Sequence, residues 1–172
     1  MSRFAEGAAI TTERLSLAPL RVEDADEMAA VLADEQLHAF IGGRPATPAE
    51  LRERYARLVA GSGDPGEVWL NWIVRRRADG RPVGTLQATL IDHEDRWTAY
   101  IAWVVGVEWQ GQGFASEAAR GLVAWLHQHG IYDIVAHIHP DHHASARVAA
   151  NAGLQPTDEL EDGERVWRVP GG

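Results

Sequence analysis

Hydrophobic and polar residues in the N-terminal part of the chain follow first the period of a strand and then that of a helix. Leu15 and Leu17 alternate with polar residues over 14–20, which predicts a strand. Residues 23–34 begin with an acidic turn, which the helix dipole favours, and continue as an apolar helical pattern. Residues 47–61 place apolar side chains on one helical face, between a capping box and a closing glycine. This part is therefore predicted as strand, helix, helix.

The middle of the chain changes to the pattern of strands. Apolar runs over 68–77 and 82–91 flank an Asp-Gly turn, which is typical of a hairpin. A polar turn over 92–96 separates them from a third apolar run over 97–107. Three consecutive antiparallel strands are expected.

Helical spacing returns directly after the third of these strands. Apolar residues fall three or four positions apart from Ala115 to Leu126, which predicts a helix with one buried face. A strand over 131–139, a short helix over 144–153 and a last hairpin around the Asp-Gly pair at 162–163 follow.

The predicted order of elements is β-α-α-β-β-β-α-β-α-β-β. The strand–helix–strand unit over 97–139 requires a parallel pair, so the pattern predicts an α/β protein with a mixed (α+β) sheet. The length of 172 residues favours a single domain over 1–172.

Composition narrows the classes of function. The net charge of −9 disfavours nucleic acid, because affinity for nucleic acid rests on cationic groups that neutralise phosphates. An acidic surface suits a cationic partner such as an amine, although net charge bears first on solubility. The chain has no cysteine, which excludes disulfides and thiolate catalysis. The sequence shows neither the pattern of a signal peptide nor the apolar length of a membrane span, so we expect a cytoplasmic protein without a membrane partner.

The segment VEWQGQGFASEA (107–118) places two glycines directly ahead of a predicted helix. A helix N-terminus carries free N–H groups and a partial positive charge, and Gly111 and Gly113 leave room for a phosphate to reach them. The segment is therefore a candidate binding site for a diphosphate. Glycines in a strand-to-helix turn can also be present only because the turn requires their backbone conformation. It is not a P-loop, since no lysine follows, and it lacks the G-x-G-x-x-G dinucleotide pattern.

The same segment resembles the acetyl-CoA loop of the GNAT acetyltransferase superfamily, whose pattern Q/R-x-x-G-x-G/A is matched by QGQGFA over 110–115. The stretches RLSLAPLRVEDADEM (14–28) and HHASARVAANAGLQPT (142–157) resemble the first and last motifs of one branch, the ribosomal-protein N-terminal (alanine/serine) acetyltransferases. The resemblance implies the GNAT acyl-CoA N-acyltransferase fold. It also implies acetyl-CoA as co-substrate, no metal, and transfer of an acetyl group to a primary amine.

The resemblance further implies roles for particular residues. The backbone of Trp103, Val104 and Val105 would pair with the pantetheine arm of the cofactor. The residues that would hold its diphosphate are Gln110, Gly111, Gln112, Gly113, Phe114, Ala115 and Ser116. Ser145 matches the serine that protonates the departing thiolate, although a serine there also suits a helix N-cap. His142 stands where this branch has an asparagine and would contact the cofactor.

The sequence leaves the general base open. Many relatives place a glutamate at the start of the strand over 97–107, where this chain has TAY (98–100). Glu94, Asp95, His139 and an ordered water remain as alternatives, of which His139 has an ordinary pKa nearest to neutrality. Several histidines gather in HIHPDHH (137–143), but no carboxylate or cysteine completes a familiar ligand spacing, so no metal is expected.

The acceptor also stays open at this point. The branch resemblance implies a protein or peptide N-terminus, whereas the acidic net charge suits a polyamine or an aminoglycoside-like antibiotic. A CoA-binding module without turnover is a third alternative, since the family glutamate is missing. Because the chain has no cysteine to carry the acyl group, direct attack in a ternary complex is the expected mechanism. A homodimer is a further hypothesis.

Overall fold

The computed structural model describes residues 4, 8–41 and 43–171. Over these residues the strands form one eight-stranded sheet in the order β1-β2-β3-β4-β5-β6-β8-β7. The strands are β1 (Ile10–Thr11), β2 (Leu15–Pro19), β3 (Glu67–Arg76), β4 (Pro82–Asp92), β5 (Trp97–Val105), β6 (Asp133–Ile138), β7 (Gln155–Glu161) and β8 (Glu164–Arg168). β5 and β6 are parallel, and the other neighbouring strands of this sheet are antiparallel.

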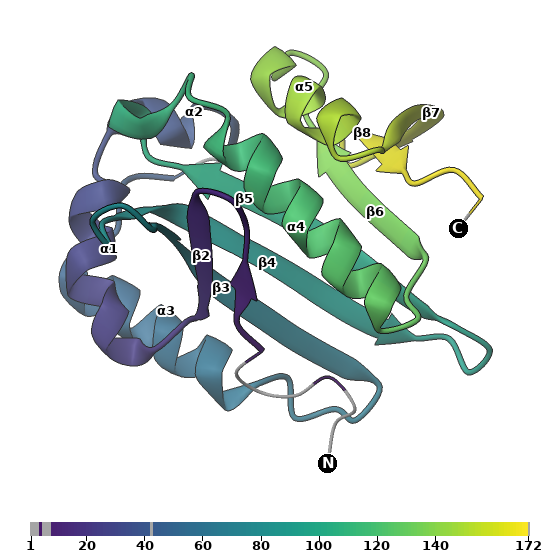
Figure 1. Ribbon diagram of the computed structural model, residues 1–172, viewed down its shortest axis with the longest axis horizontal. Helices are drawn as coiled ribbons and strands as arrows, with labels where there is room; N and C mark the ends of the chain where they lie inside the picture. The colour runs from purple at the N-terminus through teal and green to yellow at the C-terminus, as the bar shows by residue number, and fades with distance from the viewer. Residues whose placement is uncertain (1–3, 5–7, 42, 172) are drawn as a thin grey trace.

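The helices lie on both faces of this sheet (Figure 1). They are α1 (Ala25–Val31), α2 (His38–Ile41), α3 (Pro48–Ala60), α4 (Phe114–Gln128) and α5 (His143–Asn151), with short 3-10 turns η1 (Val22–Asp24), η2 (Glu35–Leu37) and η3 (Val107–Trp109). α4 crosses in front of β4 and β5 in Figure 1, and its buried side chains share one core cluster with Ala99 and Ile101 of β5. α1 and α3 pack on Ile73 of β3 through Met28, Leu51 and Tyr55.

The predicted order of elements and the mixed sheet are confirmed, with three additions. β1, α2 and the 3-10 turns were not predicted, because segments of two to four residues carry no periodic signal. The strand predicted over 97–107 ends earlier, at Val105. Gly106 follows, and a Cβ atom there would lie 2.9 Å from the carbonyl oxygen of Val31 on α1, so only glycine fits at this close approach.

α3 begins as its capping residues predict. The Thr47 hydroxyl accepts a hydrogen bond from the Glu50 N–H at 3.1 Å, and the Glu50 carboxylate accepts one from the Thr47 N–H at 3.0 Å. Pro48 occupies the first helical position, and Gly61, with a φ of +86°, closes the helix. Local signals therefore fix both ends of this helix.

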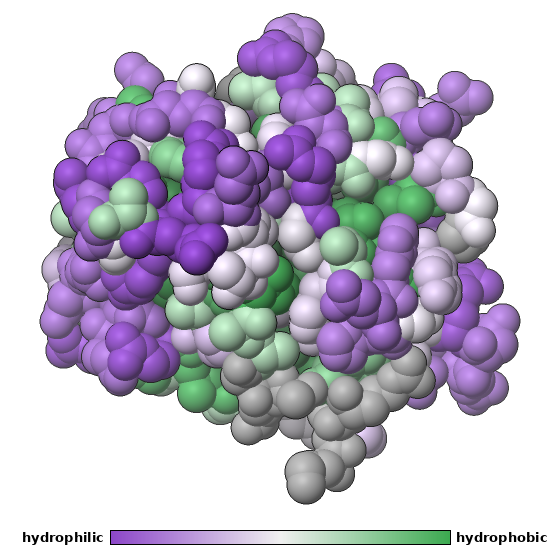
Figure 2. All heavy atoms as spheres, in the orientation of Figure 1, coloured by the Kyte–Doolittle hydropathy of each residue, from purple (hydrophilic) through white to green (hydrophobic). Residues whose placement is uncertain are grey.

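The surface is predominantly hydrophilic over α1 and α3, which lie at the left of Figure 2, whereas hydrophobic residues show in recesses nearer the centre. Within the described residues, each helix is too short or too polar to cross a membrane.

Candidate active site

β5 and β6 are paired along only part of their length. Their parallel register runs from Thr98 opposite Asp133 to Tyr100 opposite Val135. Beyond that point β6 pairs through its other edge with β8, whereas β5 continues along β4 as far as Val105. Within the described chain, the edge of β5 that turns away from β4 therefore has no strand partner from Ile101 to Val105. The two strands splay apart at this place.

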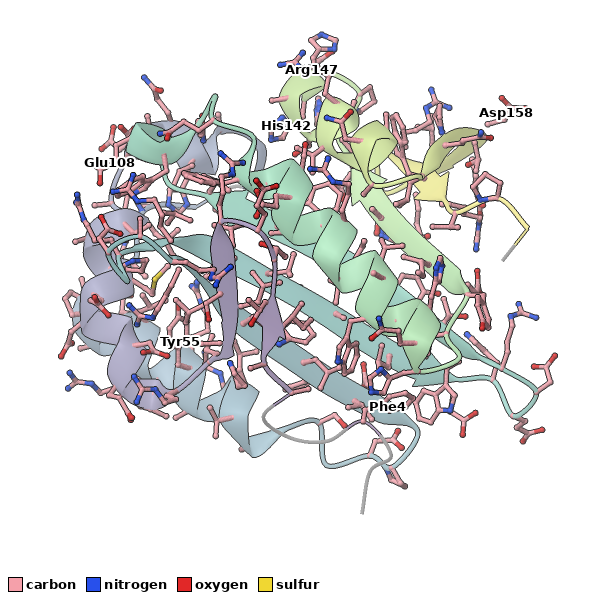
Figure 3. All side chains as sticks on the ribbon, in the orientation of Figure 1. Phe4, Tyr55, Glu108, His142, Arg147 and Asp158 are labelled. Carbon is pink, nitrogen blue, oxygen red and sulfur yellow. The ribbon has the colours of Figure 1, made fainter. Side chains whose placement is uncertain are left out.

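A cavity of about 520 Å³ opens where the two strands part. Its wall is formed by the end of β5, the turn after it, the first residues of α4, α5 and η2. Figure 3 shows His142 at the start of α5, on the side toward α4. The wall therefore joins segments from three distant parts of the sequence.

Most of the residues predicted to contact a cofactor lie in this wall. Those that line the cavity are Trp103, Val104, Val105, Gln110, Gly111, Gly113, Phe114, Ala115, Ser116, His142 and Ser145. Gln112 and His139 are not among the lining residues. The wall also contains Gln36, Arg147 and Asn151, which sequence reasoning missed because only the fold brings them to this place.

The two glycines ahead of α4 have the conformation that the candidate diphosphate site needs. Gly111 and Gly113 have φ values of +79° and +80°, in the left-handed region that favours glycine. A Cβ atom at Gly111 would have no heavy-atom neighbour within 4 Å, so this side of the turn is open. Gly113 is the N-cap of α4 and provides no capping side chain, which leaves the N–H groups of the first helical turn available to a ligand.

Arg14 lies at the turn between β1 and β2 and contacts the glycine-containing turn ahead of α4. Its Nη1 donates to the carbonyl oxygen of Gln112 at 2.9 Å, and its guanidinium lies 4.6 Å from the ring centre of Phe114. Its Nε donates to Glu117 Oε1 at 2.6 Å, while Thr12 Oγ1 donates to Glu117 Oε2 at 2.5 Å. Arg14 thus ties the turn to the first turns of α4.

Glu117 is buried beneath this contact and is held as a carboxylate. Burial alone would raise the pKa of Glu117, but the hydrogen bonds from Thr12 and from the backbone and side chain of Arg14 outweigh it and hold the pKa below its ordinary value. Nothing in the local sequence signals this pairing, since Arg14 and Glu117 are 103 positions apart.

Aromatic rings and arginines brace the start of the same turn. Trp109 is buried, and the guanidinium groups of Arg76 and Arg81 lie 4.7 and 4.8 Å from its ring centre. The side-chain amide of Gln110 donates to the carbonyl oxygen of Val105 at 3.0 Å. The backbone between β5 and α4 is therefore fixed at several points.

Ser145 is not the N-cap of α5, which corrects one of the two interpretations of this residue. It is the third residue of the helix, and the N-cap is His142, whose Nδ1 accepts a hydrogen bond from the Ser145 N–H at 3.4 Å. The Nε2 of the same ring lies 3.1 Å from the Ser145 hydroxyl oxygen. Burial and the neighbouring His139 and His143 lower the pKa of His142 below its ordinary value.

Two of the candidate bases lie far from the cavity. Glu94 and Asp95 belong to the turn between β4 and β5, whereas the cavity begins at the other end of β5. β5 has 9 residues, which at a rise of about 3.3 Å each puts roughly 25–30 Å between its two ends. This distance overturns the assignment of either carboxylate as the base. His139 accepts a hydrogen bond on Nδ1 from the Asp141 N–H at 3.0 Å.

The described residues contain no group of three or more histidine or carboxylate side chains arranged to hold a metal ion.

Comparison with known proteins identifies the family. The sequence model of the acetyltransferase (GNAT) domain matches residues 14–155. The chain belongs to the GNAT acetyltransferase family. As a GNAT protein it is an acetyl-CoA-dependent N-acetyltransferase, and acetyl-CoA is its co-substrate.

Individual relatives of this GNAT protein agree with that result. An uncharacterized N-acetyltransferase p20 from Bacillus licheniformis is 25% identical over 156 residues, which cover 90% of this chain and 86% of the relative. The ribosomal-protein-S5-alanine acetyltransferase from Vibrio fischeri superposes with a TM-score of 0.75 at 17% identity, over 94% of each chain. AAC(6')-Ib, solved with paromomycin and acetyl-CoA, superposes with a TM-score of 0.72 at 19% identity, over 91% of this chain and 92% of its own.

Proposed function

We propose that the cavity between β5 and β6 binds acetyl-CoA, and that the enzyme transfers the acetyl group to the N-terminal α-amine of a protein or peptide by direct attack. The observation that carries the proposal is the unpaired edge of β5 from Ile101 to Val105, which opens into the cavity beside Ser145. The family relationship supplies the co-substrate, and this geometry supports the cavity as its binding site.

The cofactor would occupy the cavity in two parts. The amide groups of the pantetheine arm would pair with the edge of β5 over Trp103, Val104 and Val105 that faces away from β4, as an added strand pairs with a sheet edge. The diphosphate would lie at the N-terminus of α4, where free N–H groups and the helix dipole favour negative charge. A net charge of −9 makes such local attraction necessary, because the protein as a whole repels an anionic cofactor.

The reaction would proceed in a ternary complex. The amine nitrogen attacks the thioester carbonyl carbon, and the C–S bond breaks as the tetrahedral intermediate collapses. The departing sulfur takes the hydroxyl proton of Ser145, and the nitrogen loses its proton to water. No cysteine is present to form an acyl-thioester on the enzyme, which supports direct transfer. His139, the other candidate for the general base, does not line the cavity, so the proposal gives this proton to water.

A row of uncharged groups supports a peptide as the acceptor. Asn71, Gln87 and Ala102 lie side by side on β3, β4 and β5, on the face of the sheet opposite α4. The side chains of Gln87 and Ala102 are exposed, so α1 and α3 do not extend over this part of the sheet. Neutral amide side chains offer both donors and acceptors to a peptide backbone, whereas a polycation would require carboxylates.

A small cationic acceptor is the second candidate. The net charge of −9 favours attraction of a polyamine or an aminoglycoside, and the structural neighbours include AAC(6')-Ib with its bound paromomycin. This charge is distributed over the surface, however, whereas the row on β3, β4 and β5 ends at Ala102, within the stretch of β5 that has no partner on its second edge.

A panel of acceptors tests the proposal at a fixed concentration of acetyl-CoA. Release of free CoA thiol would be followed with short peptides that carry alanine or serine first, with the same peptides blocked at the N-terminus, and with spermidine and an aminoglycoside. Turnover with the free peptides alone supports the proposal. Turnover with the polyamine or aminoglycoside alone would contradict the proposal and favour a small cationic acceptor. Binding of acetyl-CoA without turnover of any amine would indicate a CoA-binding module instead.

A further inference from the structure

His142 contacts Ser145 through both nitrogens of its imidazole ring. Nδ1 accepts the Ser145 N–H at 3.4 Å, and Nε2 lies 3.1 Å from the Ser145 hydroxyl oxygen. Both residues line the cavity, and both are half-buried. The ring therefore bridges the backbone and the side chain of the same serine.

The bridge determines where the imidazole proton lies. A neutral imidazole has one nitrogen that donates and one that accepts. Because Nδ1 accepts the backbone N–H, the proton of the neutral ring is on Nε2, and Nε2 donates to the Ser145 hydroxyl oxygen. With its oxygen accepting from His142, the hydroxyl has its own proton left to donate elsewhere. Ser145 lines the cavity, so its hydroxyl can direct this proton into the cavity.

The position of His142 also favours the neutral ring. It is the N-cap of α5, and a cation at a helix N-terminus opposes the helix dipole. His139 and His143 flank it, and partial burial removes water that would solvate a charge. The N-cap role of His142 therefore also keeps its ring neutral, with Nε2 as the hydrogen-bond donor to Ser145.

We propose that His142 is a positioning residue that turns the hydroxyl proton of Ser145 toward the sulfur of acetyl-CoA. This inference rests on the proposed function, in which Ser145 is the proton donor. As the C–S bond breaks, the Ser145 hydroxyl proton moves to sulfur, and the serine oxygen recovers a proton from the water that took one from the amine. His142 gives up no proton; its Nε2–H holds the serine oxygen throughout.

Two substitutions of His142 distinguish its role as the N-cap of α5 from its role as a hydrogen-bond donor to Ser145. His142→Asn retains the cap, because the asparagine oxygen can take the place of Nδ1, but its amide nitrogen then ends short of the position of Nε2. We expect unchanged thermal stability and a kcat lower by about tenfold. His142→Ala removes cap and donor together and is expected to lose stability as well as kcat. A His142→Asn enzyme with the wild-type kcat would overturn the proposal.

A double-mutant cycle shows whether His142 acts through Ser145. Ser145→Ala should lower kcat by about a hundredfold, as loss of a general acid does. Adding His142→Asn to Ser145→Ala should cause no further loss, because the hydroxyl that His142 orients is already gone. A further tenfold loss in the double variant would mean that His142 acts directly on the cofactor or the amine, and the inference would be wrong.

Nitrogen-15 NMR of the histidine side chains tests the tautomer without any activity. At pH 7.5 the signal that disappears in His142→Asn should show a protonated Nε2 and a bare Nδ1. The opposite tautomer, or a doubly protonated ring, overturns the inference even in an active enzyme. If the wild type acetylates no amine, the proposed function fails by itself, and the NMR result still decides the tautomer.

Discussion

The guanidinium of Arg14 donates to the carbonyl oxygen of Gln112 at 2.9 Å, although the two residues are 98 positions apart. Arg14 follows the short strand β1, and Gln112 lies between the two glycines ahead of α4. The conformation of the proposed diphosphate site is thus held by the first strands of the chain. Several measurable consequences follow from this contact and from the rest of the site.

Arg14→Lys should weaken binding of acetyl-CoA and leave the smaller donor S-acetylpantetheine unaffected. Lysine keeps the charge but cannot bond Gln112 and Glu117 at once, and S-acetylpantetheine ends before the diphosphate. The less firmly held turn should raise the KM for acetyl-CoA by about tenfold, which corresponds to ~1.4 kcal/mol of binding free energy. The measurement is the KM of each donor, with Arg120→Lys, at an exposed position of α4, as the matched control. An equal loss with both donors would contradict a role specific to the diphosphate.

Gly111→Ala should weaken acetyl-CoA binding, and this loss of affinity should not be a mere result of lower stability. A left-handed φ costs alanine ~1 kcal/mol, and the new methyl group would stand on the open side of the turn. Gly163→Ala is the matched control, because its φ of +81° and its empty surroundings are similar, but it lies in the β7–β8 hairpin. Urea unfolding should show a similar loss for both variants, and calorimetry should show weaker binding for Gly111→Ala alone. Equal affinities would place the diphosphate elsewhere.

Glu117→Gln should remove part of the pH dependence of stability. The folded protein holds the pKa of Glu117 below its ordinary value of 4.5, so the carboxylate stabilises the fold fully above that pH. This contribution is lost as the pH falls through the lower pKa of the folded state. At pH 7 the substitution should cost ~1–3 kcal/mol, because the amide cannot accept every bond that Thr12 and Arg14 donate. Urea unfolding from pH 7 to 3 should show the difference between the two proteins shrinking, and a constant difference would refute the assignment.

Gln87→Lys should raise the KM of the acceptor by about threefold to tenfold and leave that of acetyl-CoA unchanged. The new charge would stand on the sheet face opposite α4, where it would repel an incoming amine. Gln155→Lys, an exposed position on β7, is the control for the change in net charge. If Gln87→Lys instead affected acetyl-CoA, or affected neither substrate, the acceptor would approach from another direction.

The sequence predicted those features of the fold and the site that depend on residues close together in the chain. The capping box of α3 and the glycines ahead of α4 are each complete within a few residues, so their elements and the turn followed from the sequence. Arg14 and Glu117 were missed because their contact spans 103 positions and leaves no local pattern. Glu94 and Asp95 were wrong as bases because only the length of β5 reveals their distance from the cavity. For Ser145 the sequence permitted a cap, but His142, three residues earlier, takes that position.

The partial pairing of β5 with β6 has a consequence for how such enzymes diverge. The slot between the strands exists because β5 continues along β4 while β6 leaves β5 after the Tyr100–Val135 pair, so the course of the main chain outlines it. Mutation can therefore change residues around the slot without closing it. This agrees with a superposition at a TM-score of 0.75 on a relative that shares 17% of its residues. Under the proposed function, a new acceptor could be acquired by changing side chains on the far face, while the fold keeps the proposed place for the acyl donor.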